Sequence, residues 1–189
     1  AGKIYLPLDV SLALPRLRYL IEDSRARLLL TDAPTLTLAR ELIANTALPI
    51  LNLDSLPNRA LPAAFPTTIT PDRLAALLYT SGSTAQPKGV MHSHRTLLHL
   101  TMRYTNLHRV TQHDRIGLLR TLTVIGGSTH SLGTLLNGAA LFPLNLKQHG
   151  ILNLLDWLRT NQISMCSFGP TLIRTIAGNA TATEPLPAL

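Results

Sequence analysis

A polar segment between two apolar stretches, Thr80 to Gly89, carries the residues best suited to chemistry in this chain of 189 residues. It reads Thr-Ser-Gly-Ser-Thr-Ala-Gln-Pro-Lys-Gly, which places hydroxyls, small residues and one lysine together. Such a loop can surround a phosphate, because amides and hydroxyls donate hydrogen bonds while Lys88 supplies a positive charge. A Walker-type P-loop is excluded, because Lys88 precedes Gly89 and does not follow it. On these residues alone, a plain surface turn is the alternative.

The elements around this loop follow an alternating pattern. The apolar run before the loop predicts a strand, and the residues after it predict a helix. Helices are expected at Leu12–Ser24, Leu36–Ile43, Ser93–Asn106, Ser131–Leu136, Ile151–Thr160 and from Pro170 onward; strands at Ala26–Thr31, Leu48–Leu53, Leu74–Tyr79, Ile116–Leu119, Ala139–Phe142 and Ile163–Phe168. Four prolines mark residues 54–71 as a surface connection. This alternation predicts an α/β fold with a mostly parallel sheet flanked by helices.

Composition narrows the classes of protein that this chain can represent. Hydrophobic residues make up 46% and charged residues 14%, which excludes a disordered chain. The net charge is +7, but the basic residues are scattered, so we expect no nucleic-acid partner. No stretch reaches membrane-spanning length. The single cysteine, Cys166, forms no internal disulfide and is expected to be a core thiol, which fits a cytoplasmic location.

The segment Tyr79-Thr-Ser-Gly-Ser-Thr-Ala-Gln-Pro-Lys-Gly89 resembles the signature loop of the adenylate-forming (AMP-binding) superfamily. That superfamily includes nonribosomal peptide synthetase adenylation domains, acyl-CoA synthetases and fatty-acyl-AMP ligases. The opening Ala1-Gly-Lys-Ile-Tyr-Leu-Pro-Leu-Asp9, the segment Val90-Met-His-Ser-His-Arg95 and the segment Leu135-Leu-Asn-Gly-Ala139 are similar to further family segments, in family order. The opening segment favours the peptide-synthetase branch.

The resemblance implies a reaction and its cofactors. Members bind ATP with Mg²⁺, form an acyl-adenylate from a carboxylic acid, and pass the acyl group to the thiol of phosphopantetheine or coenzyme A. A carrier protein or downstream synthetase domains would be partners. By position, the implied phosphate-binding residues are Thr80, Ser81, Gly82, Ser83, Thr84, Ala85, Lys88 and Gly89. Mg²⁺ would accompany ATP near Thr80 and Thr84, without a direct protein ligand, and no catalytic residue is assigned.

One position of the signature departs from the family pattern. The family has glycine where this chain has Ala85. If that glycine has a positive φ, alanine costs about 1 kcal/mol or shifts the loop, which weakens phosphate binding without abolishing it. Ala85 also supports the alternative of a degenerate, non-catalytic nucleotide-binding or structural module of a synthetase.

A second departure concerns the substrate. Members that activate amino acids carry a Phe-Asp pair, whose aspartate holds the α-amino group, where this chain has Val124 and Ile125. No carboxylate lies between Asp114 and Asp156, and a buried ammonium without a countercharge is costly. We therefore expect a fatty, aryl or other acid without the amine. By the same count, Ile125, Gly126 and Thr129 would line its pocket.

Three histidines also invite a chemical interpretation. His92 and His94 could chelate a metal from a strand, but the sequence offers no third ligand nearby. By the family pattern, His94 orders the following helix. For His130, a polar helix start is favoured over contact with substrate.

The sequence of 189 residues lacks the later family motifs for adenine, ribose and the C-terminal lysine. We expect residues 1–180 to form part of the large N-terminal AMP-binding domain and residues 181–189 to be a truncated or disordered tail. Because the chain begins at Ala1 without Met, it is expected to be a piece of a longer protein, inactive in adenylation by itself.

Overall fold

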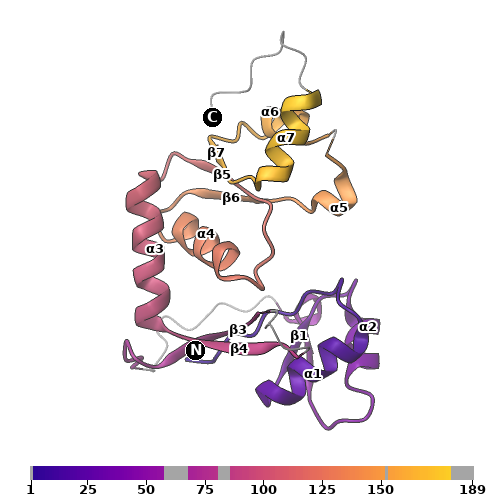
Figure 1. Ribbon diagram of the computed structural model, residues 1–189. Helices are drawn as coiled ribbons and strands as arrows, with labels where there is room; N and C mark the ends of the chain where they lie inside the picture. Colours follow the sequence, from indigo (N-terminus) through magenta and orange to yellow (C-terminus); the bar gives the residue numbers. More distant parts are fainter. Residues whose placement is uncertain (1, 58–67, 81–85, 152, 180–189) are drawn as a thin grey trace. The chain divides into compact units, whose positions relative to one another are not determined.

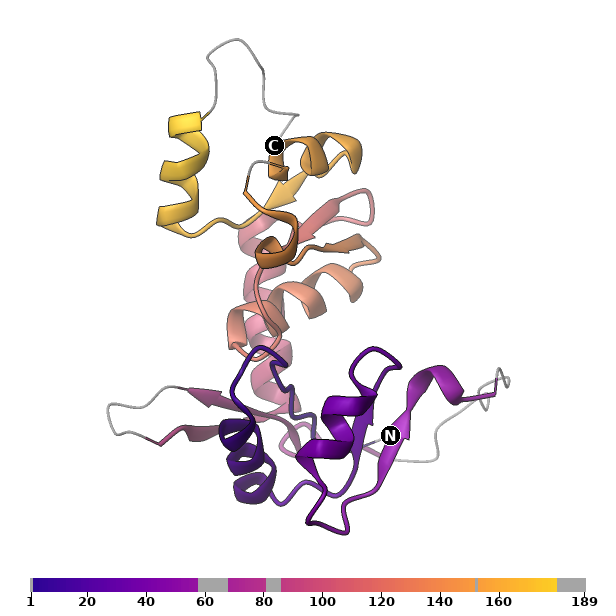
Figure 2. The ribbon, with the colours of Figure 1, turned by 90° about the vertical axis from the view of Figure 1, so that its right-hand side faces the viewer.

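The computed structural model describes residues 2–57, 68–80, 86–151 and 153–179, and it divides into an N-terminal unit, Ala1–Arg95, and a C-terminal unit, Thr96–Leu189 (Figures 1 and 2). The expected tail, residues 181–189, lies outside the described residues. Each unit is an assembly of helices on strands.

The N-terminal unit contains α1 (Leu14–Ser24), β1 (Leu29–Thr31), α2 (Leu36–Leu42), β2 (Ile50–Asn52), a short 3-10 helix at Leu53–Ser55, β3 (Leu74–Thr80) and β4 (Lys88–Ser93). Strands β1 and β2 pair in parallel, whereas β3 and β4 pair antiparallel. Leu17 and Ile21 of α1 pack against Leu42 of α2 to form the core of this unit.

Helix α1 shows why these residues form this element. Pro15 stands in the first turn, where its missing N–H is not needed. Leu17, Leu20 and Ile21 recur at helical spacing and are buried. The helix ends where Arg25 adopts a left-handed conformation with φ of 51° and its N–H donates to Glu22 O.

Helix α3 (His94–His108) begins in the last two residues of the N-terminal unit and continues into the C-terminal unit. The C-terminal unit also contains β5 (Arg115–Leu118), α4 (Ile125–Leu135), β6 (Ala140–Pro143), α5 (Leu146–His149), α6 (Leu154–Thr160), β7 (Met165–Cys166) and α7 (Pro170–Asn179). Strand β5 lies between β6 and β7, and both pairings are parallel. Figures 1 and 2 show α4 on one side of these strands and α6 and α7 on the other.

Neighbouring residues of β5 show how the two faces are filled. Ile116 packs with Tyr104 of α3, whereas Gly117 lies beneath Trp157 of α6 and Cys166 of β7. This alternation is that of a strand buried on both faces. The expected α/β fold with a mostly parallel sheet is therefore confirmed, and the antiparallel β3–β4 pair is its exception.

Several element boundaries differ from the sequence-based expectation. Strand β4 occupies residues expected to be loop and helix start, and α4 begins six residues before the expected Ser131. The strand expected at Ile163–Phe168 is limited to Met165–Cys166, and α5 was not expected. His130 therefore lies inside a helix and not at its start.

Candidate functional site

The hairpin of β3 and β4 brackets the polar signature segment. The two strands pair in register from Leu77 with Met91 to Thr80 with Lys88, at the end of the hairpin. Directly opposed residues of an antiparallel pair project from the same face, so Thr80 and Lys88 share one face. Both side chains are exposed. Ser81, Gly82, Ser83, Thr84 and Ala85 lie outside the described residues.

On the other face of the hairpin, Tyr79 pairs with Gly89. A Cβ on Gly89 would lie 3.2 Å from Cζ of Tyr79 and 3.0 Å from Cδ1 of Leu77. Real Cβ atoms rarely approach so closely. Glycine at this position therefore leaves room for the Tyr79 ring to lie across the neighbouring strand.

Helix α1 is hydrogen-bonded to Tyr79 and Pro87, the residues that directly precede Thr80 and Lys88. The Tyr79 hydroxyl donates to Oδ2 of Asp23 at 2.5 Å, and the Tyr19 hydroxyl donates to the carbonyl oxygen of Pro87 at 3.2 Å. Burial raises the pKa of Tyr79, and the bond to Asp23 raises this pKa further. Because Tyr19 and Asp23 are four residues apart, they lie on one face of α1.

Two further contacts hold strand β3: backbone pairing with Tyr5, and an ion pair between the residues that flank the hairpin. The backbone of Tyr5 exchanges two hydrogen bonds with β3, to Ala75 O at 2.8 Å and from Leu77 N at 2.9 Å. Where β4 ends, the Arg95 guanidinium contacts the Asp72 carboxylate at 2.8 Å and 3.1 Å. The Tyr5 segment was recognised from its family pattern, but its pairing with β3 was not expected.

The residues expected to line an acid pocket lie in the first turns of α4. Ile125 and Thr129 are four residues apart on one helical face and are half-buried, as is Gly126. A Cβ on Gly126 would lie 3.3 Å from Nη1 of Arg120, so a cation reaches this turn. A Cβ on the adjacent Gly127 would lie 2.1 Å from the carbonyl oxygen of Thr121, which requires glycine there.

A half-buried histidine follows on the same helix. The His130 ring stacks on Tyr104 of α3 with 4.5 Å between ring centroids. Burial lowers the pKa of His130, and the charges of Arg120 and His108 lower it further. The surroundings of His130 therefore favour its neutral ring.

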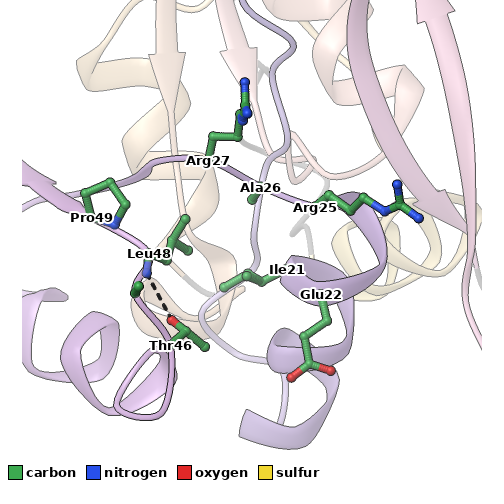
Figure 3. A pocket seen from close by; sticks show the side chains of 9 residues that line it. Ile21, Glu22, Arg25, Ala26, Arg27, Thr46, Leu48 and Pro49 are labelled. Atoms are coloured by element: carbon green, nitrogen blue, oxygen red, sulfur yellow. Dashed lines mark hydrogen bonds between the residues drawn. The ribbon is translucent and has the colours of Figure 1, made fainter.

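The remaining features of the described residues do not form a second candidate site. A hollow of about 420 Å³ beside the end of α1 is lined by Ile21, Leu48 and Pro49, and its charged Glu22, Arg25 and Arg27 extend in different directions (Figure 3). No group of three metal-binding side chains occurs in the described ranges. Burial lowers the pKa of His92. Within the same ranges, no helix is long and apolar enough to cross a membrane.

The chain is similar in sequence to known proteins. A family model described as AMP-binding enzyme matches residues 1–188. Surfactin synthase subunit 2 of Bacillus subtilis (strain 168) is 37% identical over 151 residues, which cover 76% of this chain and 4% of that protein.

Two solved structures share the fold. The inhibitor-bound N-terminal domain of FACL13 from Mycobacterium tuberculosis has a TM-score of 0.83 at 19% identity, over 98% of this chain and 48% of that chain. The nonribosomal peptide synthetase FmoA3 bound to alpha-methyl-L-serine-AMP has a TM-score of 0.82 at 24% identity, over 98% of this chain and 20% of that chain. The present chain spans less than half the length of each of these proteins.

Proposed function

The chain belongs to the AMP-binding enzyme family, and on that premise we propose that it holds the triphosphate of ATP while a carboxylic acid is activated as an acyl-adenylate. The acyl group would then pass to the thiol of phosphopantetheine or coenzyme A. The whole reaction is assigned to a protein that also supplies the adenine, ribose and lysine motifs, which residues 1–189 lack.

The observation that carries this proposal is the pairing of Thr80 with Lys88 at the end of the β3–β4 hairpin. It places a hydroxyl and an ammonium on one exposed face, at the two ends of the residues 81–87. A hydroxyl donor and a cation fit phosphate oxygens. The same strand ends delimit the segment that matches the family signature, so Ser81, Gly82, Ser83, Thr84, Ala85 and Gly89 are proposed to complete the phosphate site.

The residues of this site would act by electrostatics. ATP supplies the adenylyl group, and pyrophosphate leaves from it when the carboxylate oxygen forms its bond to the α-phosphorus. Negative charge then accumulates on the departing phosphates. The Lys88 ammonium and the Thr80 hydroxyl, fixed in place beforehand by strand pairing, would offset that charge and lower the barrier.

Magnesium would enter with the nucleotide. Mg²⁺ commonly keeps several waters and binds phosphate oxygens with few protein ligands. Thr80 and Thr84 are the proposed neighbours of this ion. This arrangement requires no cluster of carboxylates in the chain.

The proposed substrate is a carboxylic acid without a free α-amine. Ile125 stands where amino-acid-activating relatives carry the aspartate, and Arg120 lies against Gly126 one residue later. An ammonium group there would meet the positive charge of Arg120, which is unfavourable. Ile125, Gly126 and Thr129 are the proposed lining of this site, with a fatty or aryl acid as occupant. A carrier protein as acyl acceptor and a cytoplasmic location remain predictions.

Calorimetric titration of the 189-residue chain with ATP tests the phosphate site. We expect binding that requires Mg²⁺ and that tripolyphosphate displaces, because the contacts are made to the β- and γ-phosphates. AMP, which lacks both phosphates, should displace little. No heat of binding with ATP and Mg²⁺ would refute the proposal.

Ala85 favours a second candidate, a module that keeps the fold without the chemistry. Such a module would bind neither ATP nor tripolyphosphate, even after Ala85 is replaced by glycine. Pyrophosphate exchange over a panel of acids, measured with the chain extended by the later motifs, separates the two candidates: turnover supports the enzyme and excludes the inert module.

A further inference from the structure

Helix α1 is hydrogen-bonded to the two residues that directly precede Thr80 and Lys88. Tyr79 is the last residue before Thr80, and Pro87 is the last before Lys88. Their partners, Asp23 and Tyr19, come from the same helical face, more than fifty residues earlier in the chain. Two strand ends are thus connected through one rigid element.

We propose that Tyr19 and Asp23 are positioning residues that hold Thr80 and Lys88 at the separation required for binding phosphate. This inference rests on the proposed function. The terminal pair of a ladder opens more readily than the interior pairs. The two bonds to α1 restrain the strand ends independently of that ladder.

The local packing supports a restraint over an incidental contact. Gly89 leaves space for the Tyr79 ring to cross β4 on its way to Asp23. Pro87 is buried although both its neighbours, Gln86 and Lys88, are exposed. The carbonyl oxygen of Pro87 accepts a part-buried hydrogen bond from the Tyr19 hydroxyl.

The negative charge of Asp23 and its positioning role predict opposite changes in phosphate affinity when Asp23 is replaced. The Asp23 carboxylate is bonded to Tyr79, the neighbour of Thr80. If Asp23 acted only through its negative charge, its removal would lessen Coulomb repulsion and strengthen the binding of a polyphosphate. A positioning role predicts the reverse. The direction of the change in affinity therefore separates the two effects.

The experiment measures Mg²⁺-tripolyphosphate binding to the 189-residue chain for Asp23→Ala, Asp23→Asn and Tyr19→Phe. One lost hydrogen bond corresponds to about a threefold to tenfold loss of affinity, which we expect for Asp23→Ala and Tyr19→Phe. Asp23→Asn should retain most of the affinity, because its amide oxygen still accepts from Tyr79. Glu22→Ala, on the same helix, and Tyr5→Phe are matched controls without such bonds in the described residues, and should bind like wild type.

Amide hydrogen exchange of Thr80 and Lys88 in the free chain provides a second readout. Faster exchange at both amides in Asp23→Ala and Tyr19→Phe, with core amides of α1 unchanged, supports the positioning role and excludes general unfolding. Unchanged exchange, or wild-type affinity in both variants, overturns it while leaving the phosphate site intact. Failure of the wild-type chain to bind tripolyphosphate refutes the proposed function, and the exchange rates still decide whether α1 restrains the strand ends.

Discussion

The hairpin of the N-terminal unit and helix α4 of the C-terminal unit differ in how they relate to the family pattern. In the hairpin, the described signature residues Thr80, Lys88 and Gly89 follow the pattern and are supported by α1. In α4, the backbone packs so closely that Gly127 admits no side chain, and Ile125 is the residue that we propose stands in place of the family's aspartate. The described hairpin residues thus follow the signature on which the proposed phosphate site relies, whereas α4 combines a tightly packed backbone with a proposed departure from the family pattern.

The largest expected effect tests the constraint on α4. Gly127→Ala should lower the free energy of unfolding of the C-terminal unit by about 3 kcal/mol, because the new Cβ would overlap a backbone carbonyl. Gly89→Ala should cost about 1 kcal/mol in the N-terminal unit, because its Cβ meets only side chains. Urea unfolding followed by the fluorescence of Trp157, the single tryptophan, measures the first, and amide exchange in β3 the second.

Gly169→Ala is the control for both, since nothing lies within 4 Å of its added Cβ and no unusual φ is involved. Equal costs for Gly127→Ala and Gly89→Ala would remove the difference in constraint between the two regions.

The second prediction distinguishes the roles of Lys88 and Arg120 in binding phosphate. Lys88→Gln should weaken Mg²⁺-tripolyphosphate binding by about tenfold or more, because a charged hydrogen bond contributes about 1.5–3 kcal/mol. Arg120→Gln should leave that affinity unchanged if Arg120 belongs to the acid site. Calorimetry on both variants makes the measurement. Equal losses would indicate a general attraction between a basic chain and a polyanion.

The third prediction concerns the departure within the signature. Ala85→Gly should strengthen ATP binding by about fivefold, if the family's backbone at this position has a positive φ that costs alanine about 1 kcal/mol. Ala85 itself lies outside the described residues. Calorimetry compares the two chains. No gain in affinity would show that alanine is tolerated there without strain.

The smallest effect is a pH dependence in the C-terminal unit. Burial lowers the pKa of His130 below its usual value near 6.5, so the folded unit favours the neutral ring. The unfolded state then binds more protons as pH falls through 6.5, and stability that is complete above that pH declines below it. Thermal melts followed by Trp157 should show a smaller loss from pH 7.5 to pH 5.5 in His130→Gln than in wild type. His99→Gln is the control, and an equal loss in all three contradicts the prediction.

The fold could be predicted from the sequence more completely than the contacts between its elements. Alternating apolar runs were sufficient for the parallel strands, because buried strands repeat a simple pattern. Strand β4 escaped recognition, because most of its side chains are exposed and its extended form depends on pairing with β3. Gly126 and Gly127 concealed the start of α4, since glycine has low helix propensity and is retained there for close packing.

The candidate site shows the same division. Thr80, Lys88 and Gly89 were predicted as phosphate-site residues from their positions in the signature segment, and the structure adds the cross-strand register of that segment's ends. Tyr19 and Asp23 could not be identified, because nothing local in α1 distinguishes a tyrosine or aspartate that bonds to a distant hairpin from one that faces solvent. Long-range hydrogen bonds leave no periodic pattern in a sequence.

The central claim is that the end of the β3–β4 hairpin binds the phosphates of ATP. Titration of the isotope-labelled 189-residue chain with ATP and Mg²⁺, followed by backbone amide shifts, tests it most directly. We predict the largest shifts at Thr80, Lys88 and Gly89, reproduced by tripolyphosphate and absent with AMP. Shifts concentrated in the hollow beside Arg25 and Arg27, with the hairpin amides unmoved, would contradict it.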